Sequence, residues 1–147
     1  MKKIITQYMA ILPKIELLTF LPLLGIRLWI ANVFWKSGLT KIDSWQSTID
    51  LFRDEYKVPL LPPEIAALMG TGVELTAPIL VALGLGARFG ALALLLMTAV
   101  IEFTYGSFDI HKVWALMLLL IITNGPGRAS VDYLIRKKLE NSTFCKI

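Results

Sequence analysis

The chain has little of the chemistry that soluble redox enzymes carry. Cys145 is its only cysteine and His111 its only histidine. A single cysteine excludes an intrachain disulfide, a Cys-x-x-Cys redox centre and a thiolate cluster within the chain. A single histidine excludes a haem held between two histidines of this chain, and it leaves no compact set of metal ligands. We therefore expect no metal site and no cofactor built into the chain, and we assign no catalytic residue.

Charge is also scarce. Only 18% of the 147 residues are charged, 56% are hydrophobic, and the mean hydropathy is +0.66. A soluble domain of this size could not bury that much apolar surface, so we expect one integral membrane domain over residues 1–147. The net charge of +4 is concentrated in the tails, where it suits an anionic membrane surface. No basic and aromatic stripe of the kind that binds nucleic acid is present.

Four apolar segments are candidates for crossing a membrane, at about residues 17–39, 64–84, 87–106 and 109–124. A crossing helix needs about 20 apolar residues. The fourth segment is short, but Lys112 at its start can extend its side chain to the interface. The sequence therefore predicts an all-α fold, an integral membrane antiparallel four-helix bundle.

Lysine and arginine counts predict the orientation of this bundle. One side would hold nine basic residues and the other five. The richer side carries Lys2, Lys3, Lys14, Arg88, Arg128, Arg136, Lys137, Lys138 and Lys146; the poorer side carries Lys36, Lys41, Arg53, Lys57 and Lys112. Because basic loops stay inside, both termini are predicted to be cytoplasmic.

Two further helices are predicted outside the spans. Trp45, Ile49, Phe52 and Tyr56 recur at helical spacing, which indicates an amphipathic interfacial helix between spans one and two. Residues 130–140 predict a short basic helix on the cytoplasmic face, with the serine at 130 as its N-cap.

The sequence also indicates what precedes the first span and where that span ends. Ile4 to Leu12 reads as an interfacial helix that stops near Pro13. Gly38 is read as the residue that ends the first span, since glycine is common where helices stop.

Two charges lie in the middle of apolar runs. Arg27 interrupts the first span and Glu74 the second, and each costs about 2.5–3.5 kcal/mol at the centre of a membrane helix. Each is ten residues from the cytoplasmic end of its span, roughly 15 Å deep at 1.5 Å per residue. We expect the two to pair. The pair would either fix the register of two helices or anchor a polar head group inside a pocket.

A second polar group gathers at the outer end of the chain's third and fourth spans. It contains Glu102, Tyr105, Asp109 and His111, with Trp114 three residues further. One interpretation is solvation of the interface with helix capping. The other is an acid–base or ligand-binding cluster at the mouth of a pocket.

Taken together, these segments resemble the DoxX family of small four-span bacterial membrane proteins, from about Ile26 to Leu134. The resemblance rests on Arg27, on Ser37-Gly38 with Lys41, on Trp45, on the run from Val58 to Ala67, on Glu74 with Pro78, on Gly84-Leu85-Gly86-Ala87-Arg88, on His111 with Trp114, and on Gly125-Pro126-Gly127 with Ser130 and Asp132. It implies a multi-pass protein of the bacterial inner membrane. It also implies an association with oxidoreductases, since the family takes its name from a subunit associated with a quinol oxidase and thiosulfate:quinone oxidoreductase.

Three functions compete at this point. The first is a membrane component of an oxidoreductase system that binds a quinone or a similar lipid-soluble ligand and associates with redox partner proteins. Its ligand-binding residues would be Arg27, Glu74, Glu102, His111 and Trp114. The second is a non-enzymatic scaffold or assembly protein whose buried charges are structural. The third is a small-solute transporter, which would need a homo-oligomer, and the glycine-rich start of span three offers a surface for one.

Overall fold

The computed structural model describes residues 20–106 and 108–141, and every element in that part of the chain is helical. The elements are α2 (Phe20–Asp43), α3 (Trp45–Asp50), the π-helical turn η1 (Leu51–Tyr56), α4 (Pro63–Leu83), α5 (Ala87–Thr104), α6 (Asp109–Asn124) and α7 (Val131–Asn141). The all-α prediction is confirmed. The predicted interfacial helix at Ile4–Leu12 lies outside the described residues.

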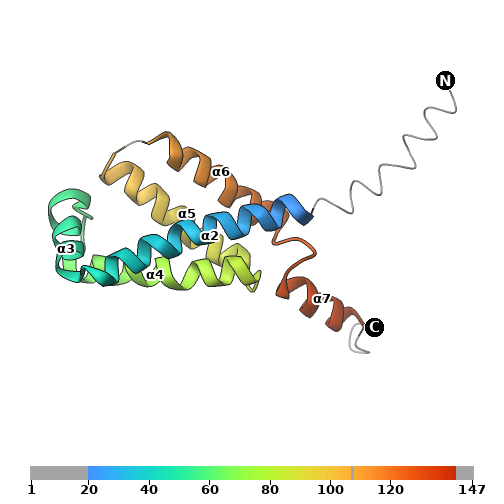
Figure 1. Cartoon of the computed structure of the whole chain (residues 1–147). Helices are drawn as coiled ribbons and strands as arrows, with labels where there is room; N and C mark the ends of the chain where they lie inside the picture. Colours follow the sequence, from blue (N-terminus) through green and yellow to red (C-terminus); the bar gives the residue numbers. More distant parts are fainter. Residues whose placement is uncertain (1–19, 107, 142–147) are drawn as a thin grey trace, which may run out of the picture.

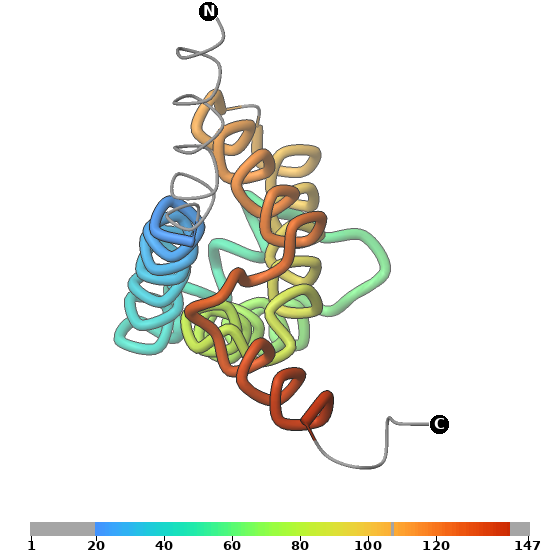
Figure 2. The backbone as a smooth tube through the Cα atoms, turned by 90° about the vertical axis from the view of Figure 1, so that its right-hand side faces the viewer, coloured from blue at the N-terminus to red at the C-terminus, as the bar shows by residue number. Residues whose placement is uncertain are grey.

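Four helices form the core. α2 packs against α4, α4 against α5, and α5 against α6, which also contacts α2 (Figures 1 and 2). The buried side chains that they share include Ile30, Phe34, Val81, Leu94 and Ile121. α3 and η1 lie across one end of these helices, and α7 projects at the other (Figure 1). We call these the α3 end and the α7 end.

Proline and glycine set the bounds of the helices. Pro63 is the first residue of α4, where its missing N–H costs nothing. α4 ends at Gly84, whose φ of 69° lies in the left-handed region, and the Leu85 N–H then donates to the Leu80 carbonyl at 3.1 Å. The predicted spans 64–84 and 109–124 therefore agree with the observed helices to within one residue.

Within residues 20–106 and 108–141, two helices, α4 and α5, are long and apolar enough to cross a membrane. α6 has 16 residues, and polar Arg27, Asn32 and Lys36 interrupt α2. The apolar pair α4 and α5 is consistent with a membrane location. A four-span bundle with both termini in the cytoplasm remains a prediction.

The predicted interfacial helix between the first two spans is present in altered form. It is a six-residue α-helix followed by a six-residue π-helical turn, which ends where Lys57 adopts a φ of 42°. Ile49 and Phe52 are buried against Ala66 and Ala67 of α4. The apolar face of this segment therefore packs on the protein itself, and the segment closes the α3 end.

The predicted C-terminal helix is confirmed as α7. The Ser130 Oγ accepts a hydrogen bond from the Tyr133 N–H at 3.2 Å, as an N-cap does.

The prediction that Gly38 ends the first helix is wrong. α2 continues to Asp43, and Gly38 is buried inside it. A Cβ at this position would lie 2.9 Å from the Leu75 side chain and 3.1 Å from Cβ of Glu74. Glycine is needed here because α2 and α4 approach closely, and that approach places Glu74 beside α2.

Candidate functional site at the α3 end

A buried ion pair joins α2 and α4. The Lys41 Nζ lies 2.7 Å from both carboxylate oxygens of Glu74, and the two side chains are 9% and 2% exposed. Ser37, one turn before Lys41, completes the cluster: it donates to Glu74 at 3.1 Å and accepts from Lys41 at 2.9 Å. The Glu74 charge is thus balanced within the chain. Its partner, Lys41, lies just beyond the predicted first span at residues 17–39.

Arg27 does not pair with Glu74, so that prediction is wrong. Its guanidinium donates to four backbone carbonyls, those of Val81, Ala82, Pro126 and Ala129, at 2.6–2.9 Å. Two of these carbonyls belong to the last turn of α4, where carbonyls lack the usual partners within the helix, although that of Val81 also accepts the Gly84 N–H at 3.2 Å. Arg27 also lies at the negative end of the helix dipole. It therefore ties α2 to the end of α4 and to the loop after α6.

The antiparallel arrangement of α2 and α4 explains why the two charges miss each other. Arg27 lies beside Val81, seven residues and about 10 Å along α4 from Glu74. Lys41 is fourteen residues after Arg27 on the same buried stripe of α2, which also carries Ile30, Phe34 and Gly38. Helical spacing from Arg27 would have predicted Lys41 on the same face. It did not do so because the helix was predicted to stop at Gly38, before Lys41.

Part of the predicted outer cluster lies together, and its role stays a prediction. The His111 Nδ1 lies 2.8 Å from Oε2 of Glu102, which also accepts the Phe108 N–H at 3.2 Å. The His111 ring is 5.2 Å from the Trp114 ring, centroid to centroid. Three of the five predicted site residues therefore come together where α5 meets α6, while Arg27 and Glu74 lie in separate clusters.

A chain of aromatic rings passes through His111. From Phe34 the contacts run through Trp114, His111, Phe108, Tyr105 and Tyr56 to Phe52, with centroids 4.9–5.9 Å apart. Most of these contacts are edge-on or tilted, which is the arrangement that aromatic pairs prefer. The chain of rings crosses the α3 end from α2 to α6, then back to η1.

Two cavities meet at Tyr56. One is polar, about 710 Å³, and is lined by hydroxyl, carboxylate and amine groups that include Ser37, Lys41 and Glu55. The other is an apolar groove of about 330 Å³ between α4, α5 and η1, lined by side chains such as Met69, Leu96 and Met97. Tyr56 lines both. Sequence patterning had indicated Tyr56 as a residue of an amphipathic face, with no sign that it separates two cavities.

The environment of Tyr56 changes its acidity. Burial raises its pKa from 10.0 to about 12, and the neighbouring Glu74, Tyr105 and Glu55 add to the effect. The phenol therefore stays protonated and can donate a hydrogen bond at any physiological pH.

Two buried polar atoms have no partner among the described residues. They are the Oγ1 of Thr71, one turn before Glu74, and the Nε1 of Trp114. Most buried polar groups are hydrogen-bonded, so these two atoms are exceptions within the described part of the chain. Within the same part of the chain, no three His, Cys, Asp or Glu side chains converge as metal ligands would.

Comparison with known proteins places the chain in a family. It is 29% identical over 136 residues to a protein of Haemophilus influenzae described only as an uncharacterized protein, and the match covers 84% of this chain and 89% of that one. No solved structure matches the chain. The DoxX family model matches residues 22–107, which hold most of α2, all of α3 to α5, the Lys41–Glu74 pair and the residues that line both cavities. The chain therefore belongs to the DoxX family.

Proposed function

We propose that this protein is a membrane component of an oxidoreductase system and that it holds a quinone-like, lipid-soluble ligand at the α3 end. One observation carries the proposal: Tyr56 lies between an apolar groove and a polar cavity. A quinone has an apolar tail and a ring with two carbonyl acceptors. The groove suits the tail, and the polar cavity suits the ring.

One hydrogen-bond donor is available where the ring would lie, the hydroxyl of the protonated Tyr56. The three N–H groups of Lys41 are taken by Ser37 and by both carboxylate oxygens of Glu74, so that pair would lie beside the ring as a fixed polar group. Carbonyl acceptors in a largely apolar site are typically fixed by a few such groups. The His111–Glu102 pair, linked to Tyr56 through the ring contacts of Phe108 and Tyr105, would exchange protons with the surroundings. Electrons would come from a redox partner protein.

Arg27 has no part in this site. Its guanidinium is occupied by four carbonyls at the α7 end, so Tyr56 would hold the head group in its place.

The test is binding of decylubiquinone to the purified protein in mild detergent. Leu96→Trp would fill the groove, because Leu96 lines it and is 60% exposed. Leu92→Trp is the matched control, since Leu92 lies one turn away on α5, is 45% exposed and does not line the groove. We expect the Leu96 variant to lose at least about tenfold in affinity (about 1.4 kcal/mol) and the control to bind as the wild type does. Absent binding by the wild type, or equal loss in both variants, would refute the proposal.

A structural role is the second candidate, and the satisfaction of the buried charges favours it. Glu74 and Arg27 both have their partners within the chain, as charges that only orient helices would. The protein would then be a scaffold for a membrane-associated enzyme. Purification from native membranes distinguishes the two: a stoichiometric soluble enzyme with no retained quinone supports the scaffold, and a retained quinone supports the ligand site.

A further inference from the structure

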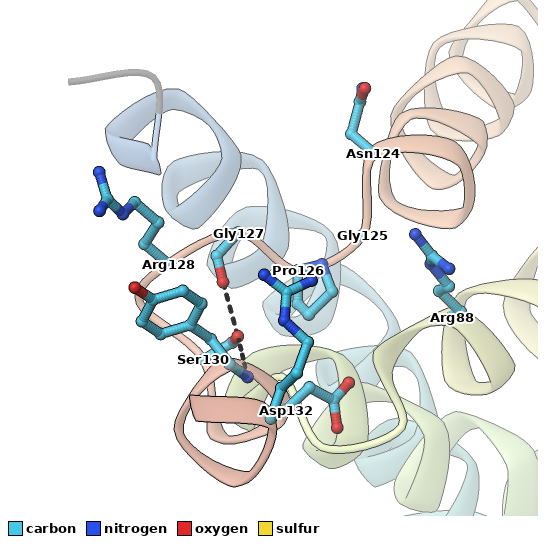
Figure 3. Close-up of a pocket in the computed structure, with 10 residues that line it drawn as sticks. Arg88, Asn124, Gly125, Pro126, Gly127, Arg128, Ser130 and Asp132 are labelled. Atoms are coloured by element: carbon cyan, nitrogen blue, oxygen red, sulfur yellow. Dashed lines mark hydrogen bonds between the residues drawn. The ribbon is translucent and has the colours of Figure 1, made fainter. Parts of the chain in front are cut away.

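The α7 end holds a pocket that the proposed function does not use. It has a volume of about 550 Å³ and lies between the start of α5, the loop 125–129 and α7 (Figure 3). Three arginines line it, Arg88, Arg128 and Arg136, against a single acid, Asp132. All three are exposed, and an anion among them would relieve the repulsion between their charges.

The single acid is already engaged. Asp132 accepts the Gly86 N–H at 2.8 Å and the Ala87 N–H at 3.3 Å, so its carboxylate caps the first turn of α5. In Figure 3 the carboxylate points towards the turn that precedes Arg88. No ion pair links Asp132 to an arginine in the described part of the chain. The positive charge of the pocket is therefore not neutralised by its own lining.

The arginines are held but keep free donors. The Arg88 guanidinium lies over Gly125, where an added Cβ would be 3.3 Å from its Nη2, and it donates to the Thr123 carbonyl at a long 3.4 Å. Arg128 lies 6.0 Å from the centroid of the Tyr133 ring, a cation–π contact that uses no N–H. Arg136 contacts Glu140 through Nε alone, at 3.3 Å. Most guanidinium N–H groups remain available for a ligand.

We propose that this pocket binds a phosphate group, with the three arginines that line it as its donors. A planar guanidinium group donates two parallel hydrogen bonds to a pair of phosphate oxygens, and a phosphate has enough oxygens to accept from more than one arginine at once. The group could be carried by a phospholipid head or by a soluble phosphate compound. Lipid is the source that α7 favours, because Leu134, Ile135 and Leu139 are 45–62% exposed beside the pocket, as on a helix that lies in a membrane interface.

The test uses the full-length protein in mild detergent and native mass spectrometry. Phosphatidylglycerol and phosphatidylcholine are added in turn, and inorganic phosphate and glycerol phosphate are titrated separately by calorimetry. The variant is Arg88→Gln combined with Arg128→Gln. Lys137→Gln is the matched control, because Lys137 is an exposed cation of α7 that does not line the pocket.

We expect the wild type to retain phosphatidylglycerol, and the double variant to lose at least about tenfold in apparent affinity, while the control changes less than twofold. Arg88→Lys keeps the charge but loses the planar, two-point donor geometry of the guanidinium, so it should bind phosphate with intermediate affinity. Equal melting temperatures for all variants show that folding is intact. Binding of inorganic or glycerol phosphate that depends on the same arginines, without lipid retention, supports the pocket and assigns it a soluble ligand. Equal losses in the double variant and the Lys137 control, or no phosphate binding of either kind, overturns the proposal.

Discussion

Removing one partner of the Lys41–Glu74 pair should be the most destabilising single change at the α3 end. The Nζ is 2.7 Å from both carboxylate oxygens, and both side chains are at most 9% exposed. At that distance and an effective dielectric of about 20, the attraction is about 6 kcal/mol. The desolvation of the two charges offsets much of this attraction. When one partner is removed, the remaining buried charge keeps its desolvation cost and has no attraction to balance it. We expect Lys41→Met and Glu74→Gln each to lower the free energy of unfolding by about 3–5 kcal/mol.

A double-mutant cycle separates the pair from general packing loss. The double variant leaves no uncompensated charge, so it should be clearly more stable than the sum of the two single losses predicts. We expect a coupling energy of about 2–3 kcal/mol. The assay is equilibrium unfolding in mixed detergent micelles, followed by tryptophan fluorescence.

Two control cycles sharpen the result. Arg53 and Glu64 form an exposed pair at 3.3 Å with side chains 48% and 56% exposed, so their coupling should stay below about 1 kcal/mol. Arg27 and Glu74 do not touch, so their losses should add to within about 0.5 kcal/mol. A Lys41–Glu74 coupling as small as either control would refute the reasoning.

Three further predictions follow from single positions. Arg27→Lys should melt well below the wild type, because a lysine cannot serve four carbonyls spread over α4 and the loop after α6; a melting curve like that of the wild type would show that the fork is dispensable. Gly84→Ala should destabilise by more than about 2 kcal/mol, because its φ is 69° and the new Cβ would lie 2.5 Å from Cβ of Ser130, whereas Gly72→Ala, with nothing within 4 Å, should stabilise by about 0.5–1 kcal/mol in the same unfolding assay. Because the folded state holds Tyr56 protonated to a pKa of about 12, the unfolded state loses that proton first above pH 10, so stability should fall between about pH 10 and 12. Tyr56→Phe should reduce this alkaline loss, and an unchanged pH profile would contradict the assignment.

The sequence by itself determined the helices. Apolar runs and their Gly and Pro boundaries gave segments 64–84 and 109–124 almost as observed, because local spacing and helix-stop chemistry decide where a helix can run. Ser130 as an N-cap followed from the same local rules. The closeness of Glu102, His111 and Trp114 was also within reach, since one short connection joins the two helices that carry them.

Only the tertiary structure decided which buried charges meet. Arg27 and Glu74 looked matched because each lay at a similar distance from the end of its predicted span, but depth alone does not fix the sliding of one helix against another. The close approach at Gly38 sets that register, places Glu74 beside Lys41, and leaves Arg27 to the carbonyls at the end of α4. The position of Tyr56 between two cavities and the presence of three arginines around one pocket at the α7 end have the same origin. They join residues far apart in the chain, and the packing of α2, α4, α5 and α7 brings them together.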